Sequence, residues 1–291
     1  MNELFKAILL VVVGLAGDPE HAEIFKKWGA AMAAAAKNVG VPPDRIIQLG
    51  EQSTKTDVEG AFGTIAKKVG ADDVVFVVLI GHGSFDGKVA KFNLKGPDMT
   101  PADFNAQLKK LPTQHVVFVD TTSSSGPFAQ ELAGPGRTIV TATRSGAEQY
   151  DTLFAGYFVD AFNSETADAD KNHRVTLKEA FDYAQREVTR TYEKEGLLAT
   201  EHSVMDDGGK LASTFSLGTA GMGELPLDPK LRDLYIQRRE LEQRVEALKV
   251  LKGSMDPARY EAELEKAVTA LALKSREIRQ IEATKPGGEV K

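Results

Sequence analysis

The strongest constraint on the fold of this chain is a pair of short apolar runs, each of which ends in a polar cluster. The runs are Val74–Ile80 and Val116–Val119, and both are continuous and rich in Val and Phe. Such runs are typical of strands that are buried on both faces. His82 follows the first run, and the cluster Asp120–Ser123 follows the second.

A helix is predicted between the two runs. Thr100 is a suitable N-cap, Pro101 fits the first turn, and Asp103 lies where the positive end of the helix dipole favours an acid. A strand, a helix and a second strand of this length form a parallel unit with a right-handed crossover. The carboxyl ends of parallel strands meet at one crevice, so we expect His82 and Thr122 to face each other.

This arrangement resembles the caspase and legumain (clan CD) cysteine peptidases. In these enzymes an apolar strand precedes His-Gly, and a second strand precedes an acid-led cluster that holds the nucleophilic Cys. Gly81–Gly83 matches the first half of the motif, and Asp120–Gly126 matches the second. Thr122 stands where the family has Cys, and the chain contains no cysteine. The resemblance extends over roughly residues 8–217, where strands and helices alternate.

The resemblance implies a catalytic role for the residues of this motif. His82 would be the general base, Gly83 would help to form an oxyanion hole, and Asp120 would open the nucleophile cluster. The alternative for His82 is a residue that only caps or hydrogen-bonds a loop. An alcohol needs a stronger base than a thiol does, so we favour a structural Ser/Thr-rich turn at Thr122 and Ser123 over a hydroxyl nucleophile.

The most apolar run of the chain is Ala7–Leu15, and it has two interpretations. It is either the first buried strand or the apolar core of a signal peptide. We favour the strand, because Glu3 weakens the basic segment that a signal peptide requires. The run is too short to span a membrane. The expected localisation is therefore soluble, or extracytoplasmic if a natural signal peptide has been trimmed.

Further strands and helices alternate along the chain. Expected helices are 19–38, 54–69, 151–163 and 177–195, and expected strands are 45–49, 137–142 and, as a last edge strand, 213–217. Arg144 and Ser145 follow the strand 137–142 and could line a substrate pocket, although Arg144 could equally be a surface residue. Residues 201–209 are predicted to form a solvated polar loop.

A second motif, Asp168–Glu179, resembles the calcium loop of an EF-hand. The candidate ligands, at loop positions one, three, five, seven, nine and twelve, are Asp168, Asp170, Asn172, Arg174, Thr176 and Glu179. His173 stands where Gly is expected, and its left-handed backbone would weaken the affinity for Ca²⁺. The alternative is an acidic turn with helix-capping side chains.

The C-terminal part of the chain has the pattern of a helical hairpin. Apolar residues recur at three–four spacing on both sides of a break at 252–257, with Arg238 and Lys274 interrupting the pattern. The hairpin either folds back on itself or on the neighbouring domain, or serves as a coiled-coil arm for homo-oligomers or other partners. The tail from 284 to 291 is expected to be disordered.

The sequence as a whole predicts a three-layer, caspase-like α/β sandwich with a mostly parallel sheet at 1–222, and a hairpin at 223–283. The net charge of −6 and the pI of about 5.5 give no sign of nucleic-acid binding. The favoured function is a peptidase homologue that has lost its Cys and binds protein or peptide. Alternatives are an active hydrolase that uses Thr122 or Ser123 with His82, and a calcium-tuned interaction scaffold.

Overall fold

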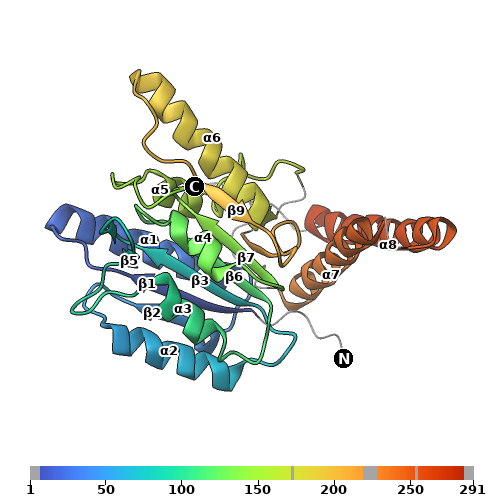
Figure 1. Ribbon diagram of the computed structural model, residues 1–291. Helices are drawn as coiled ribbons and strands as arrows, with labels where there is room; N and C mark the ends of the chain where they lie inside the picture. Colours follow the sequence, from blue (N-terminus) through green and yellow to red (C-terminus); the bar gives the residue numbers. More distant parts are fainter. Residues whose placement is uncertain (1–6, 172–173, 219–227, 253–254, 285–291) are drawn as a thin grey trace. The chain divides into compact units, whose positions relative to one another are not determined.

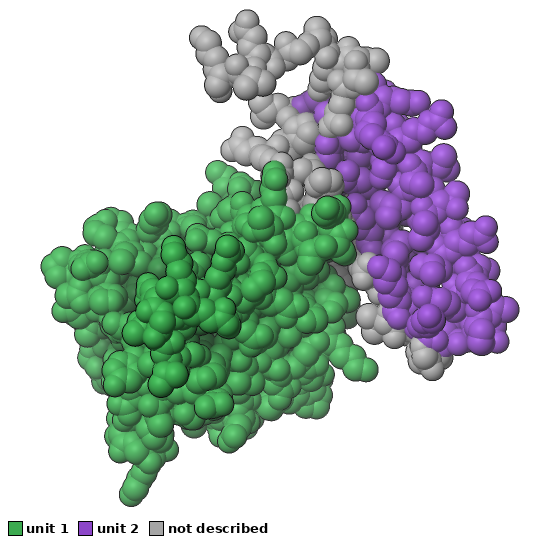
Figure 2. All heavy atoms as spheres, turned by 90° about the horizontal axis from the view of Figure 1, so that it is seen from above, with its two compact units in different colours: residues 1–221 green, residues 222–291 purple. Residues whose placement is uncertain are grey.

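The computed structural model describes residues 7–171, 174–218, 228–252 and 255–284. It divides into two compact units, Met1–Gly221 and Met222–Lys291, which are called the α/β unit and the helical unit below (Figure 2). The predicted domain boundary at 222 and residues 285–291 of the predicted tail lie outside the described residues, and Thr284 is the last residue of a helix.

A six-stranded sheet forms the centre of the α/β unit (Figure 1). In spatial order its strands are β2 (Ile46–Leu49), β1 (Ile8–Val13), β3 (Val75–Ile80), β6 (Val116–Asp120), β7 (Arg137–Thr141) and β9 (Val204–Asp206). The first five are parallel to one another, and β9 is antiparallel to β7. The parallel strands therefore all end at the same edge of the sheet.

Helices cover both faces of this sheet, which gives three layers. One face packs against α1 (Pro19–Asn38), α5 (Phe154–Ala161) and α6 (Leu177–Glu195). The other face packs against α2 (Lys55–Lys68), α3 (Pro101–Leu108) and α4 (Gly126–Leu132). The mixed α/β class, the mostly parallel sheet and the three-layer arrangement are those of the caspase-like fold, so the predicted fold class is confirmed.

The first strand shows why the apolar runs are continuous. Ile8, Leu10 and Val12 pack on one face of the sheet, and the residues between them pack on the other. Every side chain of β1 is buried, because helices pack against both faces of the sheet. The prediction that this run is a strand is confirmed.

Capping side chains determine where several helices begin. The Thr100 hydroxyl accepts a hydrogen bond from the Asp103 N–H, and the Asp103 carboxylate accepts one from the Thr100 N–H. Thr54 and Asp57 form the same reciprocal pair at α2. These capping boxes satisfy backbone donors that a helix leaves unpaired in its first turn.

Two predictions at the end of the α/β unit are wrong. The polar loop predicted at 201–209 contains the edge strand β9, which pairs with β7. The expected edge strand at 213–217 is instead β10 (Ser216–Gly218), which pairs with β8 (Val175–Thr176) in a separate two-stranded sheet. The Asp207 carboxylate supplies the reason, since it accepts hydrogen bonds from the Thr138 hydroxyl and the Leu211 N–H and thereby holds β9 beside the sheet.

The remaining short elements lie just before β2 and just after β3. A 3-10 turn at Pro43–Arg45 leads into β2, and β3 is followed by a small hairpin of β4 (Gly83–Phe85) and β5 (Ala90–Phe92). This hairpin begins directly after His82, so the strand end that carries the histidine continues into ordered backbone.

The helical unit consists of α7 (Pro229–Leu251) and α8 (Pro257–Thr284), which pack against each other. Two apolar clusters join the helices, one around Leu231 and Ile278 and the other around Val245 and Ala267. Arg238 lies between the clusters on α7, where it pairs with Glu242 at 3.2 Å. The interruptions noted in the sequence thus form a charged layer between two apolar layers.

Among the residues that the structure describes, no helix is both long and apolar enough to cross a membrane.

Phe104 is predicted to be essential for the packing of the α2–α4 layer. Its ring is fully buried and lies 5.3 Å from that of Phe118 and 5.9 Å from that of Phe128, centroid to centroid. Phe104→Ala should lower the free energy of unfolding by about 3–5 kcal/mol, because it removes this apolar contact and leaves a cavity. Urea unfolding measures the change. Tyr150→Ala, at a side chain that is 70% exposed, is the control and should change stability by less than about 0.5 kcal/mol.

Candidate functional site

The polar ends of β3 and β6 meet at Gly83. A Cβ on Gly83 would lie 2.0 Å from the Ser123 carbonyl oxygen and 2.7 Å from the Thr122 hydroxyl oxygen. Only glycine fits, because any larger residue would overlap the backbone of the neighbouring loop. The structure therefore brings together two of the sequence motifs, through the backbone of Gly83.

The Thr122 hydroxyl is directed at Asp120. Its oxygen lies 2.7 Å from Asp120 Oδ1, to which it donates, and 3.1 Å from the Ser123 carbonyl oxygen. The Thr122 N–H donates to the same carboxylate oxygen at 3.0 Å. Thr122 is only 1% exposed and Asp120 is fully buried. The side chain at the predicted nucleophile position thus closes a local turn.

The Ser123 hydroxyl forms hydrogen bonds with both the N–H and the carbonyl group of Gly83. It accepts a hydrogen bond from the Gly83 N–H at 3.3 Å and donates to the Gly83 carbonyl at 3.1 Å. The N–H that the family resemblance assigns to an oxyanion hole is therefore already bonded within the chain. Ser123 itself is 4% exposed.

The His82 imidazole makes its polar contacts elsewhere. Nε2 lies 3.0 Å from the Ala16 carbonyl oxygen, and Nδ1 lies 3.1 Å from a carboxylate oxygen of Asp151. Its ring packs edge-on against His21 and Phe25. Within the described part of the chain, no hydrogen bond joins His82 to the hydroxyl of Thr122 or Ser123, so the two strand ends meet without pairing imidazole and hydroxyl.

Burial changes the acidity of Asp120. Desolvation raises the pKa of its carboxyl group to about 7, although the two hydrogen bonds from Thr122 act in the opposite direction. One carboxyl oxygen, Oδ2, is buried and has no hydrogen-bond partner. An ionised carboxylate is costly in such surroundings, so the protonated form is favoured well above the usual pH range of an aspartate.

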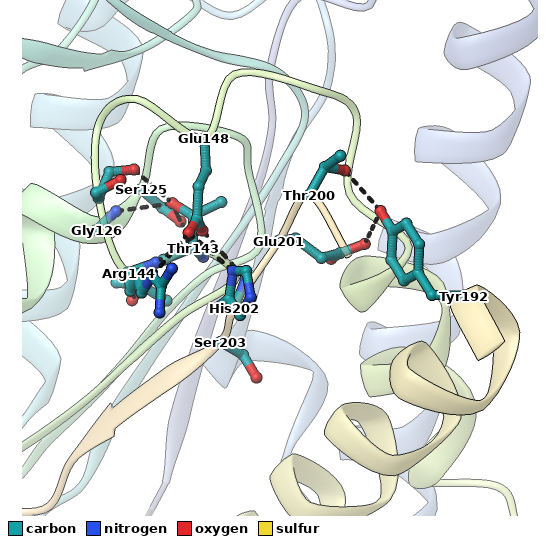
Figure 3. Close-up of polar contacts among 12 residues, drawn as sticks. Ser125, Gly126, Thr143, Arg144, Glu148, Tyr192, Thr200, Glu201, His202 and Ser203 are labelled. Atoms are coloured by element: carbon teal, nitrogen blue, oxygen red, sulfur yellow. Dashed lines mark hydrogen bonds and ion pairs between the residues drawn. The ribbon is translucent and has the colours of Figure 1, made fainter. Parts of the chain in front are cut away.

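The predicted pocket residues Arg144 and Ser145 both lie beside Glu148: the Arg144 side chain does so in Figure 3, and the Ser145 carbonyl accepts a hydrogen bond from the Glu148 N–H at 3.4 Å. The Arg144 side chain is 63% exposed, and its Nε lies 3.1 Å from Glu148 Oε1. Glu148 also contacts His202, whose Nδ1 lies 2.9 Å from Oε1 and whose N–H donates to Oε2. The Arg144–Ser145 backbone packs so tightly on Gly126 that a Cβ there would lie 2.3 Å from it.

Sequence reasoning missed Glu201 as a structural carboxylate. It is 4% exposed, and its two oxygens accept hydrogen bonds from the Leu153 N–H at 2.8 Å and the Phe154 N–H at 3.1 Å. Tyr192 lies 3.4 Å from one of these oxygens (Figure 3). Burial raises the pKa of Glu201. The residue therefore caps α5 from a distant part of the chain.

Sequence reasoning also missed His21 and Asp151 as neighbours of His82. His21 lies in the first turn of α1, just past the carboxyl end of β1, and Asp151 lies in the loop after β7. One ring nitrogen of His21, one ring nitrogen of His82 and one carboxylate oxygen of Asp151 all lie within 4.8 Å of one another. The position of His21 after the first apolar run was an available signal, because that run ends at the same edge of the sheet as the run before His82.

The predicted calcium loop brings three of its carboxylates together. Oxygens of Asp168, Asp170 and Glu179 lie within 4.8 Å of one another. Glu179 accepts hydrogen bonds from the Ala169 N–H and from the Thr176 N–H, so it joins the two ends of the loop.

The other three predicted ligands of this loop are Arg174, Thr176 and Asn172. The Arg174 side chain is buried, and the Thr176 hydroxyl caps α6 through Glu179. Asn172 lies outside the described residues. The preceding helix, α5, ends at Ala161, seven residues before Asp168, so the loop does not follow its first helix directly.

Comparison with known proteins identifies the family. The model of the peptidase C13 family matches residues 48–208, which is more than half of the chain and includes both strand-end motifs. The chain belongs to the peptidase C13 family. No curated protein searched matches it. Among solved structures, a protein from Geobacter sulfurreducens is similar, with 12% sequence identity, 74% of this chain and 99% of that chain covered, and a TM-score of 0.49.

Membership of the C13 family confirms the predicted resemblance to the legumain group of clan CD. The matched region contains His82, Asp120 and Thr122, and it ends before β10 and the helical unit. The chain is therefore a homologue of legumain-like peptidases over most of its sheet.

Asp120 is predicted to make stability depend on pH. Its pKa in the folded protein, about 7, lies above the ordinary value of 3.8. Between these values the folded state binds the proton more tightly than the unfolded state does, so the free energy of unfolding should fall as the pH rises from about 4 to about 7. The decrease should be of the order of 4 kcal/mol.

Denaturant unfolding of the wild type and Asp120→Asn across this pH range measures the effect. The difference in stability between the two proteins should change with pH, because Asn cannot ionise. A difference in stability that stays constant from acid to neutral pH would contradict the raised pKa of Asp120.

Proposed function

We propose that this C13 homologue is a catalytically degenerate peptidase whose strand-end face binds protein or peptide segments. The observation that carries the proposal is the state of the Thr122 hydroxyl, which is 1% exposed and donates to Asp120 rather than to a histidine. An alcohol reacts as a nucleophile only when an aligned base removes its proton and a substrate carbonyl can reach it.

The surroundings of Thr122 support the loss of turnover. The Gly83 N–H, which would stabilise an oxyanion, donates to Ser123. His82 contacts Ala16 and Asp151 through its two nitrogens. Catalysis would require the oxyanion donor, the base and the nucleophile each to give up an existing contact at the same time, which makes turnover unfavourable.

Exposed apolar side chains support a binding role for the same edge of the sheet. Six large apolar residues are exposed in the described part of the α/β unit. Three of them lie in the loops that follow β1 and β7, and a fourth lies in the turn between β4 and β5. These four are Leu15, Val89, Tyr150 and Leu153. Apolar side chains beside polar, hydrogen-bonding loops are typical of surfaces that bind polypeptide.

The competing hypothesis is an active hydrolase that uses the hydroxyl of Thr122 or Ser123. The raised pKa of Asp120 gives it one specific argument, because a carboxylate 2.7 Å from the Thr122 hydroxyl could accept its proton near neutral pH. Both side chains are closed off from solvent, which is the argument against it.

The proposal predicts binding without cleavage. The purified full-length chain, incubated with a diverse peptide mixture and analysed by mass spectrometry, should give no cleavage above that of His82→Ala. Peptides selected for binding to the wild type should bind at least about tenfold more weakly to the double variant Tyr150→Asp, Leu153→Asp, because charges replace apolar contacts.

Gln114→Asp is the matched control for this experiment. Gln114 is exposed in the loop before β6, at the opposite edge of the sheet, and the change introduces the same acid there. Its affinity for the selected peptides should equal that of the wild type. Cleavage that disappears in His82→Ala would establish an active hydrolase, and equal binding by all variants would place the binding surface elsewhere.

We also propose that the loop 168–179 binds Ca²⁺. The support is the convergence of carboxylate oxygens from Asp168, Asp170 and Glu179, which is the ligand type that Ca²⁺ prefers. The cation would hold the start and the end of the loop together, and thereby the beginning of α6.

Isothermal titration with CaCl₂ tests this site. We expect one equivalent to bind with a Kd of about 10⁻⁴–10⁻³ M. Glu179→Gln should abolish binding, because it removes a charged ligand while a glutamine still completes the capping box. Asp182→Asn is the control, since Asp182 pairs with Lys178 on the exposed face of α6 and should leave binding unchanged. Equal binding by both variants would contradict the proposal.

A further inference from the structure

Three side chains from separate segments converge beside the carboxyl ends of the strands. None of them belongs to the turn that contains Thr122. His21 comes from α1, His82 follows β3, and Asp151 precedes α5. His82 Nδ1 lies 3.1 Å from Asp151 Oδ1, and His21 Nε2 lies 3.5 Å from Asp151 Oδ2. The two imidazole rings are 4.7 Å apart, centroid to centroid.

The outer contacts of the two imidazoles determine which nitrogen carries hydrogen. His82 Nε2 lies 3.0 Å from the Ala16 carbonyl oxygen, which can only accept, so Nε2 is the donor. His21 Nδ1 lies 2.6 Å from an Asp18 carboxylate oxygen, so Nδ1 is the donor in that ring. In a neutral imidazole the other nitrogen then carries a lone pair.

Both lone pairs are directed at the same carboxylate. His82 Nδ1 and His21 Nε2 each lie near one oxygen of Asp151, which is itself an acceptor when ionised. Three groups of acceptor atoms repel one another unless a cation or a proton lies among them. A backbone carbonyl behind one imidazole and a carboxylate behind the other are also the outer contacts that fix metal-binding histidines.

We propose that His21, His82 and Asp151 form a binding site for a divalent transition-metal ion, with Zn²⁺ as the best match. Two imidazoles and one carboxylate are ligands that Zn²⁺ accepts, and neither Ca²⁺ nor Mg²⁺ prefers imidazole. Ligand atoms around a tetrahedral Zn²⁺ lie about 3.3 Å apart. His82 Nδ1 lies 3.1 Å from Asp151 Oδ1 and His21 Nε2 lies 3.5 Å from Asp151 Oδ2, and one ligand atom from each residue lies within 4.8 Å of the other two, so small movements would bring them to this spacing.

The exposure of the ligands describes the kind of site. The side chains of His21 and His82 are 30% and 23% exposed, and that of Asp151 is 65% exposed. Three protein ligands that remain open to solvent leave a coordination position for water or for a group from a binding partner. The ion would also keep the His82 imidazole on Asp151, away from Thr122, whether or not the protein binds peptides.

Isothermal titration of ZnCl₂ into the full-length chain tests the site. The protein must carry no histidine tag and be freed of metal with EDTA, which is then removed. The wild type should bind one equivalent of Zn²⁺ at this site. His21→Ala and Asp151→Asn should each weaken binding at least about tenfold, because each removes one of three ligands. Substituting Co²⁺ should give the visible absorption bands of tetrahedral coordination in the wild type but not in His21→Ala or Asp151→Asn.

Asp18→Asn tests the outer contact without removing a ligand. Asparagine still caps α1, as Asp18 does by accepting from the His21 N–H at 3.0 Å, so folding is preserved. We expect Zn²⁺ binding to weaken about tenfold, because the carboxylate that holds His21 Nδ1 is lost.

His202→Ala is the matched control, since His202 also pairs with a carboxylate, that of Glu148, but lies outside the three-residue group. It should bind Zn²⁺ like the wild type. Unfolding midpoints measured in EDTA show whether each variant is folded. The proposal would be overturned if the wild type bound no stoichiometric Zn²⁺, or if His21→Ala and His202→Ala bound it equally well. In that case protons, and not a metal ion, would hold the three groups together.

Discussion

Burial of the sheet on both faces is the constraint on which the rest of the structure depends. Every side chain of β1, β3 and β6 is buried, so the interior of the sheet has almost no place for an unpaired polar group. Polar residues therefore gather where the parallel strands end. Because these ends lie at one edge, residues from four distant segments come within hydrogen-bonding distance there, and the choice of partners among them decides what the edge can do.

The hydrogen bonds at this edge divide the family motif into two separate groups. Thr122 and Ser123 bond with Asp120 and Gly83, whereas His82 bonds with Ala16 and Asp151. A thiol would be acidic enough to transfer its proton to a nearby imidazole, but a threonine hydroxyl is not, and it forms a stronger contact with a carboxylate. A threonine hydroxyl at position 122 is thus consistent with a site in which His82 contacts Ala16 and Asp151 instead.

Much of the fold followed from the sequence, because the signals were local. The apolar runs predicted β1, β3 and β6, and Thr100 with Asp103 predicted the start of α3. The edge strand β9 could not be predicted, since its three residues pair with β7 only because Asp207 anchors them from outside the strand. His82 could be identified from its motif, but its partner Asp151 could not. The periodic pattern placed Asp151 at the start of a helix, whereas α5 begins at Phe154 and Asp151 lies in the loop before it.

The orientation of the His82 imidazole tests this account most directly. Long-range ¹⁵N–¹H correlation by NMR, on metal-free protein at a pH where the ring is neutral, reports which nitrogen carries hydrogen. The chain has five histidines, so His82→Asn identifies the signal. We predict hydrogen on Nε2, bonded to the Ala16 carbonyl, with Nδ1 unprotonated. Hydrogen on Nδ1, with Nε2 accepting from a hydroxyl of Thr122 or Ser123, would contradict the account and indicate an assembled catalytic pair.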